Sequence, residues 1–102
     1  MLIGTATSAY QVEGNNKNSD WWYYEKIGKL KYKSGLSSDH YHLYRTDIDI
    51  MKKLNLNSYR FSIEFSRIYP NRNNIDKKEI EHYKEVISDL NKNQIEPIVT
   101  LW

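Results

Sequence analysis

Two glutamates and one arginine are the residues of this chain whose types and positions most readily suggest chemistry. Glu13 lies in a loop of small residues near the N-terminus, and Glu64 lies near the end of the alternating segment that begins at Tyr59. If that segment is a strand of a parallel barrel, both carboxyl groups lie at the face where barrel active sites form. Arg60, on the polar side of the segment, is expected to point into an enclosed space, where a guanidinium needs a carboxylate or an anionic ligand.

Other kinds of catalytic or metal chemistry find little support in the residue types. The chain has no cysteine, so thiolate chemistry and disulfides are excluded. His40 and His42 are two residues apart within a predicted helix, where such side chains do not share a face, so we expect structural hydrogen bonds rather than a metal site. No cofactor is expected.

The segment 57–70 is the element around which the rest of the chain can be arranged, and its first part alternates. Apolar and polar side chains alternate along it: Tyr59, Phe61, Ile63 and Phe65 on one face, and Arg60, Ser62 and Glu64 on the other. This period of two predicts a strand. Amphipathic helical patterns lie on both sides of it and another apolar run follows, so the chain is expected to have an α/β fold with a parallel sheet and right-handed crossovers.

Apolar stripes at spacings of three and four define two helices. The first is predicted over Asp39–Leu54, with Ser38 as its N-cap and Asn55 or Asn57 as left-handed stops. Its stripe consists of Tyr41, Tyr44, Ile48 and Met51. The second is predicted over 77–91, with a capping box formed by Asp76 and Glu79. Its stripe consists of Ile80, Tyr83, Ile87 and Leu90, and Asn93 marks its end.

The two ends of the chain are predicted to supply further strands. Leu2–Gln11 reads as a short strand that leads into a loop, and Ile95–Trp102 reads as a third strand that is nearly continuously apolar and therefore buried on both faces. The segment 15–38 is expected to be a long polar loop. Its aromatic cluster, Trp21 to Tyr24, either pins the loop to the body of the protein or stacks on a sugar or another substrate.

Length and composition limit what the chain can be. Its 102 residues, 39% of them apolar and 14% aromatic, suffice for one small folded domain. The formal net charge of +2 comes from interspersed acidic and basic residues, which gives little reason to expect a nucleic-acid partner. There is no run long enough to span a membrane and no signal-peptide pattern after Met1, so no membrane partner and a cytoplasmic location are expected.

Four blocks of the chain, in order, resemble the conserved blocks of family 1 glycoside hydrolases, the β-glucosidase and β-galactosidase group. They are Gly4–Gly14, Asp39–Tyr44, Tyr59–Pro70 and Glu96–Leu101. The resemblance implies a (β/α)8 barrel. Such a barrel needs about 250 residues, so residues 1–102 would form its N-terminal portion, the first three strands and two helices.

The resemblance also implies the reaction, which is retaining hydrolysis of a β-glycosidic bond by two carboxyl groups about 5 Å apart. In the family both catalytic glutamates follow later strands, beyond Trp102, so the chain alone is expected to be inactive. Glu64 is then expected to make a structural pair or to line the pocket, and Glu13 to hold the first loop. Gln11 matches the glutamine that hydrogen-bonds sugar hydroxyls. Arg60 matches the arginine that keeps the nucleophile ionised, although a partner in a structural ion pair is its alternative.

Several questions stay open at this point. The alternative to a β-glycosidase is a non-catalytic sugar-binding module or an inactive remnant, and a nucleic-acid binder would rest on the isoelectric point alone. Phe65 replaces the tryptophan that the family commonly carries, and the segment between Gly14 and Asp39 is short, so the aglycone preference is undetermined. The expected partner is a small-molecule β-glycoside or oligosaccharide. Neither its sugar nor the oligomeric state follows from the sequence.

Overall fold

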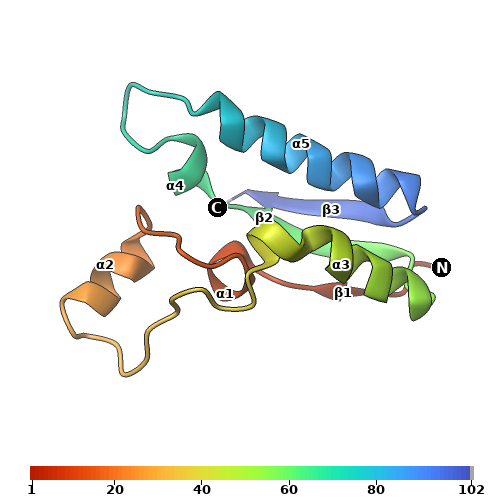
Figure 1. Ribbon diagram of the computed structural model, residues 1–102, viewed down its shortest axis with the longest axis horizontal. Coiled ribbons are helices and arrows are strands. Elements are labelled where there is room, and N and C mark those ends of the chain that lie inside the picture. The colour runs from red at the N-terminus through yellow and green to blue at the C-terminus, as the bar shows by residue number, and fades with distance from the viewer. Residues whose placement is uncertain (102) are drawn as a thin grey trace.

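The computed structural model describes residues 1–101 and shows a three-stranded parallel sheet with helices on one face (Figure 1). The strands are β1 (Gly4–Ala6), β2 (Ser58–Ile63) and β3 (Glu96–Leu101), in the spatial order β1-β2-β3. β2 is therefore central, as its alternating pattern and its place between two helices predicted. Its residues pair in register with both neighbours, Ser58 with Gly4 on one side and with Glu96 on the other.

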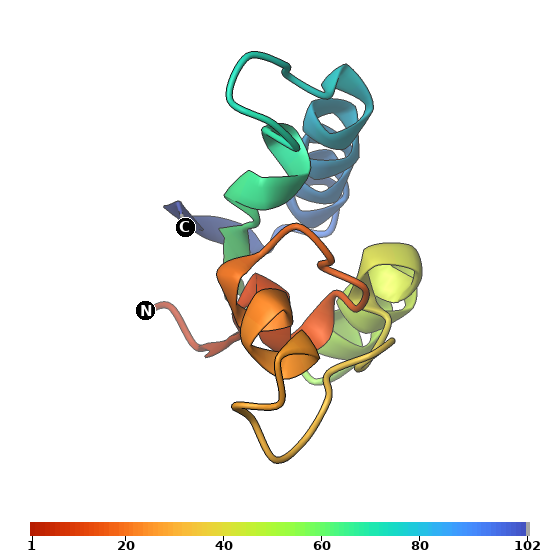
Figure 2. The same cartoon turned by 90° about the vertical axis from the view of Figure 1, so that its left-hand side faces the viewer.

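Two long helices, α3 (His40–Lys53) and α5 (Lys77–Lys92), connect consecutive strands and lie side by side on the same face of the sheet (Figure 2). The core lies between this face and the helices. It consists of Tyr44, Ile48, Met51, Tyr59, Phe61, Tyr83, Val86, Leu90 and Ile95. Both predicted stripes and the apolar side of β2 contribute to it, so the helical and strand periodicities correctly identified the buried faces.

The ends of the two long helices differ in detail from the prediction. Asp39, not Ser38, is the N-cap of α3, and its backbone is left-handed with φ of 49°. Asn55 is left-handed as expected. Asn93 is the C-cap of α5, so it marks the end of that helix as predicted, but the left-handed residue is the next one, Gln94. The Asp76 side chain accepts a hydrogen bond from the Lys78 amide and so caps α5.

Three short helices occur where no helix was predicted. They are α1 (Ala9–Val12), α2 (Asp20–Lys26) and α4 (Phe65–Ile68), which brings the number of helices within residues 1–101 to five. α2 lies inside the segment expected to be a loop, and its N-cap Ser19 accepts a hydrogen bond from the Trp22 amide. α4 ends the central strand at Ile63, because the Glu64 side chain caps the new helix by accepting from the Ser66 amide. Phe65 is therefore helical and exposed, which corrects its assignment to the strand.

The third strand is present but its predicted burial is wrong. Ile98, Val99 and Leu101 expose 44%, 37% and 67% of their surface. β3 has a hydrogen-bonded neighbour on one side only, β2, and the sheet face opposite α3 and α5 has no long helix over it among the described residues. Trp102 lies outside the described residues. None of the helices within residues 1–101 is both long and apolar enough for a membrane crossing.

Candidate active site

The carboxyl ends of the three parallel strands meet at one end of the sheet, where α1, α2 and α4 also lie (Figure 1). A cleft of about 250 Å³ opens here, and it is lined by Ser8, Ala9, Tyr10, Trp21, Ser62 and Thr100. Hydroxyl groups and aromatic faces are the groups that bind sugars, the former by hydrogen bonds and the latter by stacking. The crevice beyond the carboxyl ends of the strands is also the usual place for a ligand in α/β folds.

Gln11, the predicted sugar-binding residue, is exposed on α1 beside this cleft but does not line it. α1 has only four residues, too few to be stable alone. Its first amide, Ala9 N–H, donates a 2.6 Å hydrogen bond to Ser62 Oγ on the central strand. This hydrogen bond attaches the start of α1, the helix that carries Gln11, to β2.

Arg60, the second predicted site residue, is exposed, which corrects the expectation of an enclosed guanidinium. It pairs with Ala6 of β1 and Ile98 of β3, so it lies at the centre of the sheet. The alternation along β2 places Arg60 on the face opposite the buried Tyr59 and Phe61. Its carbonyl oxygen accepts a 2.9 Å hydrogen bond from the Thr7 amide, two residues before α1. The structure thus joins Arg60 to the segment that carries Gln11 through the backbone.

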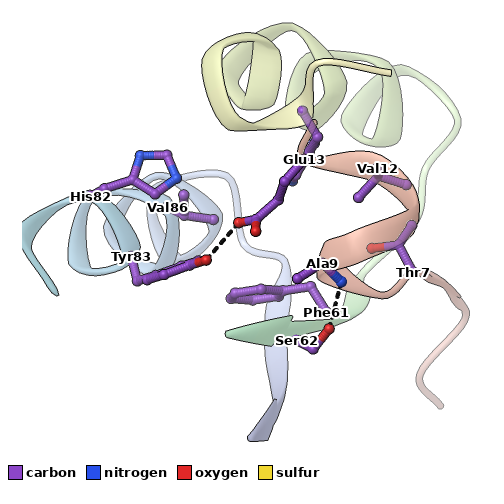
Figure 3. Close-up of a pocket in the computed structure, with 10 residues that line it drawn as sticks. Thr7, Ala9, Val12, Glu13, Phe61, Ser62, His82, Tyr83 and Val86 are labelled. Carbon is purple, nitrogen blue, oxygen red and sulfur yellow. Dashed lines mark hydrogen bonds between the residues drawn. The ribbon is translucent and has the colours of Figure 1, made fainter. Parts of the chain in front are cut away.

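Glu13 and Glu64, the two carboxylates that the residues alone suggested, are both buried and are joined by one tyrosine. Tyr83 OH donates a 2.6 Å hydrogen bond to Glu13 Oε2 and accepts a 3.1 Å bond from the Glu64 amide. Figure 3 shows the Glu13 carboxylate directed toward Tyr83 of α5, in a small cavity that Val12, His82 and Val86 also line. Burial raises the pKa of Glu13, while the Tyr83 hydrogen bond and the positive charge of Arg67 act in the opposite direction. These contacts are those of a residue that holds the first loop, as expected.

His40 has structural contacts, as expected, and they form a partly buried chain of hydrogen bonds. Its Nδ1 lies 2.6 Å from Asp47 Oδ2, and its Nε2 lies 3.3 Å from Tyr59 OH. The Tyr59 hydroxyl is in turn 2.6 Å from Thr7 Oγ1. Burial raises the pKa of Tyr59 to about 12, so this phenol stays protonated at neutral pH. Among residues 1–101, no three histidine, aspartate or glutamate side chains gather in a way that could hold a metal ion.

The aromatic cluster of α2 was expected either to pin its segment to the body of the protein or to stack on a substrate, and the structure matches neither expectation completely. Trp22 is half-buried, but Trp21, Tyr23 and Tyr24 expose 44%, 59% and 40% of their surface. The segment is held to the body instead by buried Glu25, which accepts hydrogen bonds from Tyr10 OH and from the Ser34 amide at 2.9 Å. Trp21 lines the cleft and lies near Tyr10, with 6.4 Å between ring centroids. Its face is therefore available to a ligand.

Sequence reasoning missed the roles of Arg67 and Tyr83. Arg67 Nη2 donates a 2.6 Å hydrogen bond to the Gly14 carbonyl, and its Nε lies 3.5 Å from Glu13 Oε1. Its guanidinium also lies over the ring of Tyr41, 4.1 Å from the centroid. Tyr83 was recognised only as part of an apolar stripe. The position of its hydroxyl beside Glu13 depends on contacts between segments 70 residues apart, which periodicity does not report.

The whole chain, residues 1–102, matches the model of Glycosyl hydrolase family 1. It is 41% identical to β-glucosidase 47 of Arabidopsis thaliana over 110 residues, which cover 98% of this chain and 21% of that protein. A solved β-glycosidase from Pyrococcus horikoshii is 52% identical with a TM-score of 0.93, over 98% of this chain and 24% of its own. A rice β-glucosidase mutant, solved in a covalent complex with Glc, is 34% identical with a TM-score of 0.89, and the match covers 99% of this chain and 23% of that structure. The chain therefore spans about a quarter of the length of these structures.

Proposed function

This chain belongs to glycosyl hydrolase family 1, and from that premise we propose that the intact protein is a retaining β-glycosidase. The observation that carries the proposal is the agreement with a β-glycosidase structure at 52% identity over nearly the whole chain. The described residues form the first three strands of the (β/α)8 barrel, whose complete form carries its active site at the carboxyl ends of the strands. The cleft beside α1 and α2 lies at that end.

The proposed reaction needs a nucleophilic carboxylate and an acid–base carboxylate about 5 Å apart. Glu13 and Glu64 are buried, and their carboxylates accept hydrogen bonds from Tyr83 and Ser66, so we assign neither of them to the chemistry and place both catalytic glutamates in sequence that follows residue 102. The covalent complex of the rice relative with Glc supports a mechanism through a glycosyl-enzyme intermediate. The substrate is a small-molecule β-glycoside or oligosaccharide.

Within this chain, the proposed contributions are binding and electrostatic support. The Gln11 side-chain amide can donate to one sugar hydroxyl and accept from its neighbour. Arg60 is exposed at the centre of the open sheet face, which supports the proposal that its guanidinium contacts the nucleophilic carboxylate of a later strand and keeps it ionised. The cytoplasmic location expected from the sequence stays a prediction.

The test is turnover of aryl β-glucosides and β-galactosides by the intact protein. We expect Arg60→Ala to lower kcat/KM by roughly 10²-fold or more, because an unsupported nucleophile is protonated more readily. Arg72→Ala is the matched control, since Arg72 is an exposed arginine in the loop after α4. Absence of turnover with every aryl β-glycoside would reject the proposed activity. Saturable sugar binding by the 102-residue chain without turnover by the intact protein would favour the sugar-binding module instead.

A further inference from the structure

Helix α1, which carries Gln11, is fixed at both of its ends by residues from distant parts of the chain. At its start Ala9 N–H is bound by Ser62 of β2. Immediately after its end, Glu13 Oε2 is bound by Tyr83 of α5 at 2.6 Å. Gln11 lies midway between these two attachments, and Figure 3 shows both of them around the same small cavity.

The second attachment involves more partners than the first. Glu13 Oε1 lies 3.5 Å from Arg67 Nε of α4 and 3.3 Å from Asn16 Nδ2. The carbonyl oxygen of the next residue, Gly14, accepts a 2.6 Å hydrogen bond from Arg67 Nη2. Two elements beyond the central strand, α4 and α5, therefore grip residues 13 and 14 through a carboxylate and a carbonyl.

The chemistry of this contact makes it sensitive to the loss of any one partner. A buried carboxylate is unfavourable unless a cation and hydrogen-bond donors compensate it. Glu13 is 3% exposed, and among the described residues its charge partner is Arg67. Tyr83 OH also accepts a hydrogen bond from the Glu64 amide. Its single oxygen atom therefore joins the end of β2 to the end of α1. Removing that oxygen leaves a buried carboxylate with one donor fewer.

We propose that Glu13, held by Tyr83 and Arg67, is the positioning residue for Gln11, so that the contact between α1 and α5 determines how tightly the glycosidase binds the sugar ring of its substrate. This inference rests on the proposed function, because Gln11 is taken as the residue that touches the sugar. Glu13 and Tyr83 act through Gln11 and touch no substrate. Loss of the contact should therefore weaken binding more than it slows the chemical step.

The first test is hydrogen exchange, which needs no activity. Tyr83→Phe removes only the hydroxyl, and Tyr44→Phe is its matched control, because Tyr44 OH also donates from a buried ring to a glutamate, Glu85, at 3.2 Å. We expect Tyr83→Phe to speed exchange of the Gln11 and Glu13 amides on the order of tenfold relative to the β2 amides. Tyr44→Phe should leave that ratio unchanged. Equal effects of the two variants, or none, would overturn the proposal.

The second test is kinetic and uses the intact protein with an aryl β-glycoside. We expect Tyr83→Phe to raise KM by about tenfold while kcat changes by less than about twofold, with KM unchanged in Tyr44→Phe. In a double-mutant cycle, Tyr83→Phe should add nothing to the effect of Gln11→Ala, because both act on one contact. Additive effects would overturn the proposal. Glu13→Gln, which keeps the Tyr83 contact to Glu64, should reproduce the KM effect.

The two tests separate this inference from the proposed function. If Tyr83→Phe selectively speeds hydrogen exchange of the α1 amides but the intact protein has no β-glycosidase activity, the proposed function is rejected, and with it the substrate part of the inference. Activity that depends on Gln11 but not on Tyr83 or Glu13 would reject the inference alone.

Discussion

Gly14 and Leu36 approach each other so closely that a β-carbon on Gly14 would lie 2.0 Å from the Leu36 carbonyl oxygen. Gly14 also has a positive φ of 87°, and it directly follows Glu13. The segment after α1 thus passes against the segment before α3 at a point where only glycine fits.

Gly14→Ala is therefore expected to destabilise the protein more than Gly28→Ala. Both glycines have positive φ, but a β-carbon at Gly28 would meet no atom within 4 Å. The backbone conformation alone should cost about 1–2 kcal/mol in each variant, and the clash with Leu36 should add about 1–3 kcal/mol at Gly14. Urea unfolding measures both. Equal losses would show that the close approach to Leu36 is absent in solution.

Ser62→Ala should lower the free energy of unfolding by about 1–3 kcal/mol, because the buried Ala9 amide would lose its acceptor. Ser88→Ala, at an exposed position on α5, is the control and should change it by less than about 0.5 kcal/mol. Denaturant titration followed by circular dichroism separates the two. A Ser62 variant as stable as the control would mean that another group satisfies the Ala9 amide.

Leu90→Ala should destabilise the protein by about 2–5 kcal/mol, since Leu90 is fully buried between α5 and the sheet and its truncation leaves a cavity. Leu54→Ala provides a comparison with the same chemical change, because Leu54 is 65% exposed at the end of α3. Thermal and urea unfolding should show a large effect for the first variant and a small one for the second. The reverse order would contradict the assignment of the core.

Acid should destabilise the protein through His82. Burial, followed by the charge of Arg67, lowers the pKa of His82 from 6.5 to about 4, and its ring stacks on Tyr41 with centroids 3.9 Å apart. Between pH 6.5 and 4 the unfolded chain binds a proton at this position and the native state does not, so stability decreases as the pH falls through this range. The raised pKa of Glu13 acts in the opposite direction, because its protonation is easier in the native state.

The contribution of His82 can be isolated by comparing wild type with His82→Gln. The midpoint of urea unfolding should decrease from pH 7 to pH 4.5 in both proteins, and the decrease should be larger for wild type than for the variant. Identical decreases would show that His82 titrates normally in the folded protein.

Trp21→Ala should weaken glycoside binding by the intact protein, because its exposed ring lines the cleft and offers a stacking face. Stacking of this kind contributes about 0.5–1.5 kcal/mol, so KM should rise by about two- to tenfold. Tyr23→Ala is the control, since Tyr23 is exposed on the same helix but does not line the cleft. Equal KM values for both variants would place the sugar elsewhere.

The sequence by itself determined the order of the main elements and the family. Periodicity is a local property, so it predicted the ends of β2, α3 and α5 to within two residues of those observed. It also identified the faces that form the core. The four sequence blocks identified the family because they are contiguous stretches whose residue types can be read without knowing any contact.

Only the tertiary structure decided which of these residues are enclosed and which are joined. Whether an apolar strand is buried depends on what lies beside and above it, and β3 has one strand neighbour, so Ile98 and Leu101 are exposed despite their pattern. Arg60 is exposed for the same kind of reason, because no long helix among the described residues covers its face of the sheet. The link between Glu13 and Tyr83 spans 70 residues, and such a contact follows from how α1 and α5 pack together rather than from any local pattern.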